Sequence, residues 1–409
     1  MRMLRGCLVV VCLTMTACLG LAPAAASKPI LILVAFDGWR WDYLDTLDAP
    51  ALAAMAARGV RADGLIPVYP SLTFPNHYTL VTGLRPARHG IVSNTMLDPV
   101  LPGRFSLSNT AVTSNPAWWA GEPIWHTSTR QGLKSGTMFW PGSDVAIGGH
   151  FPTYWRQFED ALPPARRTDQ VLEWLRLPEA ERPSVLTVYY SDLDTAGHDS
   201  GPGSAAVRVA AARVDHELGR LVAGVETLGL QARVHWVVVS DHGMAQLSSE
   251  RVIVLDDLLD VSTVEIVDIG SMLTLNPKDG DAPRLYATLR GRHPHLQVVR
   301  SADLPSKYGL AGHPRVPAIV GLADEGWTVM TRERLASRDP QRPWGGAHGF
   351  DPALQSMQGV FVAAGPRLRS GVRVPAFENI HVYALMCEIL DLTPAPNDGD
   401  ANLVRRWLR

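Results

Sequence analysis

Three aspartates and three histidines lie beside or near glycines in four short segments of the chain. The segments are Asp37-Gly38, Asp194-Thr195-Ala196-Gly197-His198, Asp241-His242-Gly243 and Gly346-Ala347-His348-Gly349. Mixed carboxylate and imidazole ligation suits zinc, and a zinc site that keeps one coordination position open can activate an oxygen nucleophile. Each segment alone is more often a turn or a helix cap, so it is their combination that favours a metal centre.

Thr73 is the candidate nucleophile. It stands two residues before Pro75, and the residues that follow have a helical pattern up to Gly83. Proline suits a first helical turn, so Thr73 would lie where free backbone N–H groups and the helix dipole favour an anion. Two alternatives stay open at this point: Thr73 simply caps the helix, or Ser71 takes the nucleophilic role.

This chemistry needs elements that bring the side chains to one place. Three apolar segments, residues 29–37, 184–194 and 234–241, each end in an acid, and a fourth, residues 359–364, ends before Gly365-Pro366. Continuous Val/Ile/Leu runs are typical of strands buried on both faces of a parallel sheet. Ligands of such sheets bind at the carboxyl ends of the strands. We therefore expect Asp37, Asp194 and Asp241 at one edge of a sheet.

Helical patterns alternate with these strands, at residues 51–58 (closed by Gly59), 204–229 and 379–392. The alternation predicts an α/β fold with a doubly wound, mostly parallel sheet flanked by helices. Residues 262–340 differ, because shorter strand-like runs (MLTLN, LYATLR, LQVVR and GWTVM) are separated by polar, proline-rich turns. We expect them to form a small inserted α+β subdomain.

Composition limits the classes of function. The chain has 409 residues, of which 46% are hydrophobic, enough for a large core. Its formal net charge is −2, from 38 basic and 40 acidic residues, and no basic run stands out. The basic surface of a nucleic-acid binder is therefore missing, and we expect no nucleic acid as a stable partner.

The first 26 residues have the layout of a secretory signal peptide: Arg2 and Arg5, then an apolar stretch, then three alanines ending at Ala26. The remaining residues, 27–409, would form one catalytic domain. A lipid anchor at Cys18 is the weaker alternative, and no other window is apolar enough to span a membrane. The absence of an Asn-x-Ser/Thr sequon favours a bacterial protein. We therefore expect export to the periplasm or secretion.

The sequence resembles the nucleotide pyrophosphatase/phosphodiesterase family of the alkaline-phosphatase superfamily. The resemblance runs in order through nearly the whole mature chain and through these motifs: FDGWRWDYL, PVYPSLTFPNHYTLVTGLRPARHGIVSNTMLDP, GEPIW, FWPGSD, DLDTAGHDSGP, VVSDHGM, GGAHGFDP and FENIHVYALMCEILDLTPAPNDG. It implies an alkaline-phosphatase-like fold and a catalytic domain without the family's accessory domains.

The resemblance also implies site roles. Thr73 would be the nucleophile, and Asn94 would contact a phosphoryl oxygen. Two Zn²⁺ ions per chain would be held by two sets of ligands. One set is Asp37, Asp241 and His242 with Thr73, and the other is Asp194, His198 and His348.

The implied reaction cleaves nucleotide phosphodiester and pyrophosphate bonds and releases nucleoside 5′-monophosphates through a covalent phospho-threonine. Phe74 and Phe158 would stack on the base, with Leu107 and Tyr189 as further walls of the pocket. Small nucleotides would be the substrates, and we expect a monomer. A lysophospholipid or choline-phosphate diesterase, a phosphomonoesterase, and a binding protein with closed structural metal sites stay open as alternatives.

Overall fold

The core of the protein is an eight-stranded sheet, seen in a computed structural model that describes residues 28–409. The strand order is β19-β2-β18-β9-β1-β8-β6-β7. In this order the strands are Val372–Val374, Val60–Ala62, Phe361–Ala364, Val234–Val239, Ile30–Phe36, Val185–Tyr190, Ser135–Met138 and Tyr154–Arg156.

Five neighbouring strands of this sheet, β9, β1, β8, β6 and β7, are parallel to one another. Every residue of β1, β8 and β9 is buried, as expected for Val/Ile/Leu runs covered on both faces. The fourth apolar segment forms β18, which runs antiparallel to β9. Its carboxyl end therefore lies at the opposite side of the sheet from the carboxyl ends of β1, β8 and β9.

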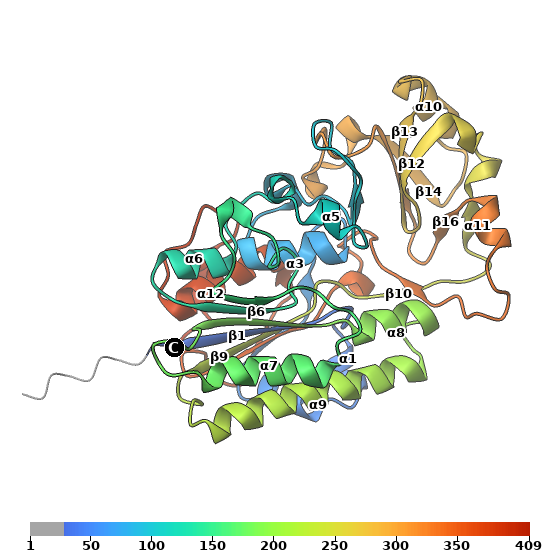
Figure 1. The fold of residues 1–409 in the computed structure, drawn as a ribbon. Helices are drawn as coiled ribbons and strands as arrows, with labels where there is room; N and C mark the ends of the chain where they lie inside the picture. Colours follow the sequence, from blue (N-terminus) through green and yellow to red (C-terminus); the bar gives the residue numbers. More distant parts are fainter. Residues whose placement is uncertain (1–27) are drawn as a thin grey trace, which may run out of the picture.

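Helices cover both faces of the sheet (Figure 1). One layer contains α2 (Pro50–Ala57), α7 (Pro164–Arg176) and α9 (Ala205–Thr227), and the other contains α3 (Thr73–Thr82), α6 (Ile124–Arg130) and α12 (Val382–Leu390). Ser204 caps α9, since its hydroxyl accepts the Val207 N–H. The α/β class predicted from the sequence is confirmed.

The helix of residues 51–58 was predicted to end at Gly59, but this glycine has a different role. Gly59 does not adopt a left-handed conformation, and Arg58 forms the C-cap of α2. A Cβ at Gly59 would lie 2.2 Å from the Ala363 carbonyl oxygen, so glycine is needed for the close approach to β18.

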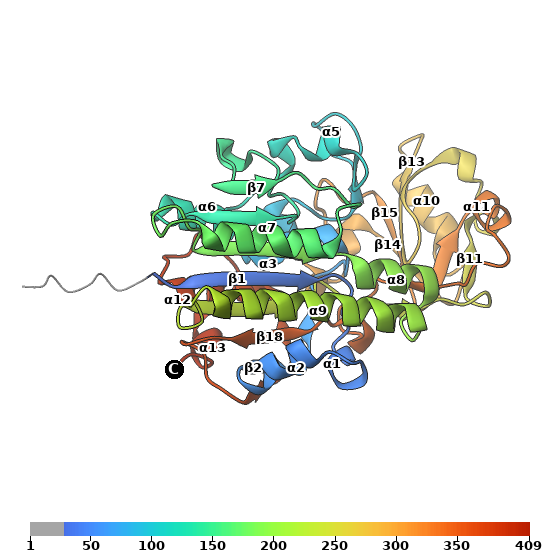
Figure 2. The ribbon, with the colours of Figure 1, turned by 60° about the horizontal axis from the view of Figure 1, so that its bottom comes forward.

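The insertion forms a second, four-stranded antiparallel sheet with its own apolar core (Figure 2). Its strands are β12 (Val264–Asp268), β13 (Met272–Pro277), β15 (Ile319–Ala323) and β14 (Leu296–Arg300). A parallel pair, β11 (Val252–Val254) and β16 (Thr328–Met330), joins it before α11 (Arg332–Ala336).

The prediction that LYATLR is strand-like was wrong, because these residues lie almost entirely in α10 (Ala282–Leu289). Asp281 caps this helix by accepting the Arg284 N–H, and Pro283 lies in its first turn. Leu285 and Leu289, four residues apart, are its buried side chains.

Shorter elements connect these units. Those nearest the carboxyl ends of β1, β8 and β9 are α8 (Asp192–Ser200), the hairpin of β4 (Thr95–Met96) and β5 (Phe105–Ser106), and the pair of β10 (Ala245–Gln246) and β17 (Gly346–Ala347). The others are α1 (Tyr43–Thr46), β3 (Leu65–Ile66), α4 (Pro86–His89), α5 (Thr110–Thr113), β20 (Phe377–Glu378) and α13 (Ala401–Arg405). Within residues 28–409, no helix has the length and apolar character needed to cross a membrane. The expected signal peptide lies outside the described residues.

Candidate active site

The sequence-predicted ligands come together at the carboxyl edge of the main sheet. Asp37 follows β1 directly, and Asp241 and His242 follow β9. Asp194 was expected at the end of a strand but lies in the first turn of α8, after β8. Gly38 has φ +71°, and a Cβ there would lie 3.0 Å from the Asp194 Cα, so glycine lets the two segments meet.

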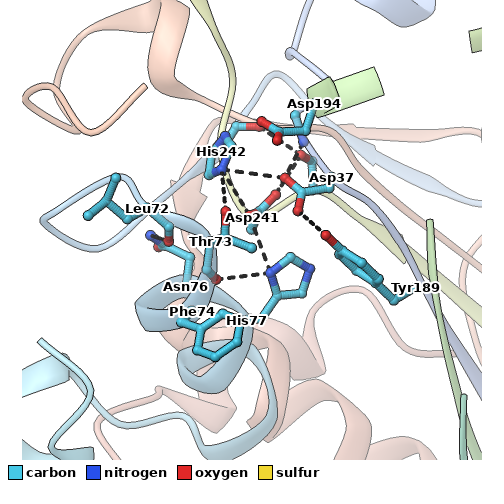
Figure 3. Close-up of polar contacts among 12 residues, drawn as sticks. Asp37, Leu72, Thr73, Phe74, Asn76, His77, Tyr189, Asp194, Asp241 and His242 are labelled. Atoms are coloured by element: carbon cyan, nitrogen blue, oxygen red, sulfur yellow. Dashed lines mark hydrogen bonds and ion pairs between the residues drawn. The ribbon is translucent and has the colours of Figure 1, made fainter. Parts of the chain in front are cut away.

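The first group of predicted ligands is Asp37, Asp241 and His242 (Figure 3). His242 Nε2 lies 3.0 Å from Asp241 Oδ2 and 3.4 Å from Asp37 Oδ1. All three side chains are almost completely buried. They converge on one point from the ends of two adjacent parallel strands.

The second group is Asp194, His198 and His348. Asp194 and His198 are four residues apart on α8 and therefore share a face, with His198 Nε2 3.3 Å from Asp194 Oδ1. His348 follows β17, and its Nε2 lies 3.1 Å from His198 Nε2 and 3.5 Å from Asp194 Oδ1. The His348 and His242 rings stack with centroids 3.5 Å apart, so the two groups adjoin.

Each of the three histidines directs the same nitrogen to this centre. Their Nδ1 atoms lie within hydrogen-bond distance of backbone carbonyls: His242 at 2.8 Å from Gly243, His198 at 3.0 Å from Gly346 and His348 at 2.8 Å from Ser71. A carbonyl only accepts, so Nδ1 carries the proton and Nε2 presents a lone pair. Outer contacts of this kind orient metal-ligating histidines in proteins.

Three carboxylate oxygens at the centre lack hydrogen-bond donors among the described residues. Asp37 Oδ1, Asp194 Oδ1 and Asp241 Oδ2 are buried and accept no hydrogen bond. Burial, together with the charges of Asp241 and Asp194, raises the pKa of Asp37 well above its ordinary value. Burying such groups is costly unless a cation neutralises them. The donor set fits divalent metal ions, and within residues 28–409 three overlapping Asp/His groups have ligand atoms within 4.8 Å of one another.

His348 supports the same conclusion. Its burial, with His242 and His198 beside it, lowers its pKa well below the ordinary value for histidine. A neutral imidazole is the form that binds a metal ion.

Thr73 lies against the first group. It is the first residue of α3, and its Oγ1 is 3.3 Å from His242 Nε2. Leu72 occupies the N-cap position, so the alternative that Thr73 caps the helix is not supported. Ser71 is fully buried and its hydroxyl donates to the Phe350 carbonyl at 2.9 Å, which leaves Thr73 as the hydroxyl at the centre.

Asn94 is held in place by the start of α3. Its Oδ1 accepts the Phe74 N–H at 2.9 Å. This bond orients the amide, and Nδ2 donates no hydrogen bond to the described residues. The Asn94 side chain is therefore a fixed donor near Thr73.

A cavity of ≈170 Å³ opens beside Thr73 and Asp194. The sequence-predicted pocket residues Phe74, Leu107, Phe158 and Tyr189 all line it. Phe158 is 49% exposed and Phe74 is half-buried, so aromatic faces are available to a ligand. The Tyr189 hydroxyl, however, donates to Asp37 Oδ2 at 2.6 Å, a contact with the first ligand group that the sequence analysis did not predict.

A family model for type I phosphodiesterase / nucleotide pyrophosphatase matches residues 31–351. The chain belongs to this family.

Curated members of the phosphodiesterase family align with nearly the whole chain. Human ectonucleotide pyrophosphatase/phosphodiesterase family member 1 is 39% identical over 403 residues, which cover 95% of this chain and 42% of that protein. The venom phosphodiesterase of Macrovipera lebetinus is 38% identical over 397 residues, which cover 95% and 46%. The chain thus spans about half the length of the curated relatives it matches.

Solved structures of the family have the same fold. An inactive threonine-to-alanine variant of murine ectonucleotide pyrophosphatase / phosphodiesterase 5, in complex with AMP, superposes with a TM-score of 0.87 at 35% identity. The human protein superposes with a TM-score of 0.88 at 34% identity. Each comparison covers 93% of this chain and 100% of the other.

His77 also lies at the site. His77 lies one turn after Thr73 on α3, and its Nδ1 is 3.0 Å from the Thr73 carbonyl and 3.2 Å from Asp241 Oδ2. Spacing of four residues from Thr73 is the sequence signal for this position. His77 ties the helix start to the first ligand group.

Proposed function

We propose that the chain is a two-zinc phosphodiesterase and pyrophosphatase that cleaves nucleotides and releases nucleoside 5′-monophosphates. The observation that carries the proposal is the position of Thr73 Oγ1, 3.3 Å from His242 Nε2, beside two adjoining Asp/His groups. A binding protein with closed structural metal sites would not need a hydroxyl there.

The residues that would hold the two Zn²⁺ ions are those of the two groups. Asp37, Asp241 and His242 would hold one ion, with Thr73 as a further contact. Asp194, His198 and His348 would hold the other. When bound, the ions lower the cost of forming the Thr73 alkoxide and stabilise the attacking and leaving oxygens of an in-line displacement.

The reaction would have two displacements at phosphorus. Thr73 gives up its hydroxyl proton, its Oγ forms a bond to phosphorus and the bond to the leaving oxygen breaks. The leaving oxygen takes up a proton, and the product is a covalent phospho-threonine diester. Water then adds to phosphorus, the Thr73 Oγ–P bond breaks, and Thr73 regains its proton. Asn94 Nδ2 would donate to a non-bridging oxygen, whose charge grows in the transition state.

Nucleotides suit the cavity beside Thr73. Two aromatic side chains, Phe74 and Phe158, can stack on any base without reading its edge. A structural relative was solved with AMP, which supports the same class of ligand here. In this proposal the nucleoside would occupy this cavity and the scissile phosphate would lie at the Asp/His groups.

The substrate class can be tested with three esters. We expect p-nitrophenyl thymidine 5′-monophosphate to be hydrolysed with a higher kcat/KM than p-nitrophenyl phosphate and lysophosphatidylcholine, and chelation to abolish the activity. Equal or better hydrolysis of the monoester would identify a phosphomonoesterase instead. Preference for lysophosphatidylcholine would identify a lipid diesterase.

A further inference from the structure

We infer that an arginine-lined cavity on the far side of the metal centre binds the leaving group when that group carries phosphate. This inference rests on the proposed function, because it assigns the second half of the same substrate. The cavity has a volume of ≈740 Å³ and lies between the main domain and the insertion. Three arginines line it: Arg334, Arg338 and Arg342.

The two cavities lie on either side of the candidate nucleophile. Thr73 lines the aromatic cavity, whereas the preceding residue, Leu72, lines the arginine cavity. On α8, Asp194 lines the aromatic cavity, and His198, one turn later, lines the arginine cavity. Leu107 lines both. A substrate cleaved at Thr73 can therefore extend from one cavity into the other.

The direction of the displacement determines which end of this substrate enters which cavity. In an in-line displacement the leaving oxygen departs on the side opposite the attacking oxygen. Thr73 adjoins the first ligand group, so the leaving oxygen lies toward the second, and His198 and His348 of that group line the arginine cavity. The leaving group therefore enters the arginine cavity.

The arginines come from one short segment, residues 334–342, at the C-terminal end of the insertion and directly after it. Arg334 lies on α11, and Arg338 and Arg342 follow it at intervals of four residues. Figures 1 and 2 show α11 beyond the end of α8, and Arg342 donates to Asp199 of α8 at 2.6 Å. This contact holds the segment against the edge that carries the metal ligands.

The three guanidinium groups differ in how they are held. Arg338 donates to the carbonyls of Asp339, Arg342 and Pro343, and its Cζ lies 4.2 Å from the centre of the Trp344 ring. None of these partners carries a negative charge. Arg334 is exposed and its side chain donates no hydrogen bond to any residue of 28–409, although its charge lies near Asp268.

The cavity contains little negative charge to compete for these donors. Asp268 is the acidic residue that lines it, and that carboxylate already accepts the Ile269 N–H at 2.9 Å and the Ser93 hydroxyl at 3.3 Å. Guanidinium groups bind phosphate through planar, charge-assisted hydrogen bonds. The chemistry that fits the cavity is therefore a phosphate-bearing leaving group, either pyrophosphate or a second mononucleotide.

The inference is tested by the ratio of kcat/KM for a phosphate-bearing substrate to kcat/KM for p-nitrophenyl thymidine 5′-monophosphate, whose leaving group has no phosphate. ATP would release pyrophosphate, and NAD would release a mononucleotide. In R334Q we expect the ratio to fall about tenfold for at least one of them. In R334K, which keeps the charge, we expect a smaller fall.

Arg332 provides the matched control. It lies on the same helix, pairs with Asp257 and does not line the cavity, so R332Q should leave both ratios at the wild-type value. If wild type hydrolyses all three substrates and the ratios in R334Q equal those of wild type, the inference is wrong and the proposed function stands. If wild type hydrolyses none of them, the proposed function itself fails.

Discussion

Replacing Tyr189 by Phe should weaken metal binding without creating a cavity in the core. The Tyr189 hydroxyl donates to Asp37 Oδ2 at 2.6 Å, and both residues are buried. Asp37 Oδ1 faces His242 Nε2 at 3.4 Å and accepts no hydrogen bond. The hydroxyl thus fixes which carboxylate oxygen is presented to the centre, and Phe removes only that hydroxyl.

The size of the effect follows from the type of bond. A hydrogen bond to a charged group contributes about 1.5–3 kcal/mol, and its loss weakens binding by about tenfold for each 1.4 kcal/mol. We therefore expect metal affinity to fall by about 10- to 100-fold, the range seen when outer contacts of metal ligands are removed.

The effect should depend on pH. Burial and the charges of Asp241 and Asp194 raise the pKa of Asp37, and the Tyr189 hydroxyl opposes this rise. Without the hydroxyl the pKa of Asp37 rises further, and a protonated carboxyl cannot ligate a metal ion. The loss of affinity should therefore be larger at pH 6 than at pH 8.

The assay is a zinc titration against a competing chelator at both pH values. Tyr190→Phe is the matched control, because Tyr190 is the next residue and also buried but pairs with Thr168 at 2.8 Å, away from the centre. It should bind zinc like wild type. If Tyr189→Phe also binds zinc within twofold of wild type at both pH values, Asp37 is not oriented in the way described.

Three further predictions concern other parts of the molecule. Phe158→Ala should raise KM for p-nitrophenyl thymidine 5′-monophosphate about tenfold, since base stacking contributes about 1–3 kcal/mol; an unchanged KM would place the base elsewhere. Asn94→Ala should lower kcat about 100-fold with a smaller change in KM, and an effect on KM alone would contradict a role in the transition state. Burial lowers the pKa of His89 to about 3, and its Nδ1 accepts the Ile91 N–H. Its contribution to stability is complete above the unfolded-state pKa of about 6.5 and is lost as pH falls toward 3, by about 2 kcal/mol between pH 6.5 and pH 5. Urea unfolding of the chelated protein should show this decrease, which His89→Gln should reduce.

Much of the fold could be predicted from the sequence, because burial of a strand or helix leaves a clear pattern of apolar residues. Strands covered on both faces read as continuous apolar runs, and β1, β8 and β9 were found in this way. Residues 184–194 were predicted to be one strand, but α8 begins at Asp192. The boundary was missed because a strand and the helix after it can both contain apolar residues. LYATLR was misread for a related reason: a short apolar pattern fits either period.

Site residues could be predicted where their spacing along the chain places them together. Contacts between residues that are distant in the sequence could not be predicted. Asp194 and His198 are separated by one helical turn, so their pairing follows from the chain itself. The contact of Tyr189 with Asp37 joins two strands and has no signal in the sequence. No sequence pattern marked Arg334, Arg338 and Arg342, which line the cavity beside the Asp/His groups only because their segment packs against α8.

The central claim is that Thr73 attacks phosphorus at a centre made of two metal sites. It is tested most directly by the kcat of Thr73→Ala at full metal occupancy, with p-nitrophenyl thymidine 5′-monophosphate as substrate. We expect no detectable turnover, because Thr73→Ala keeps the six Asp and His side chains and removes the attacking oxygen. A kcat within tenfold of wild type would contradict it.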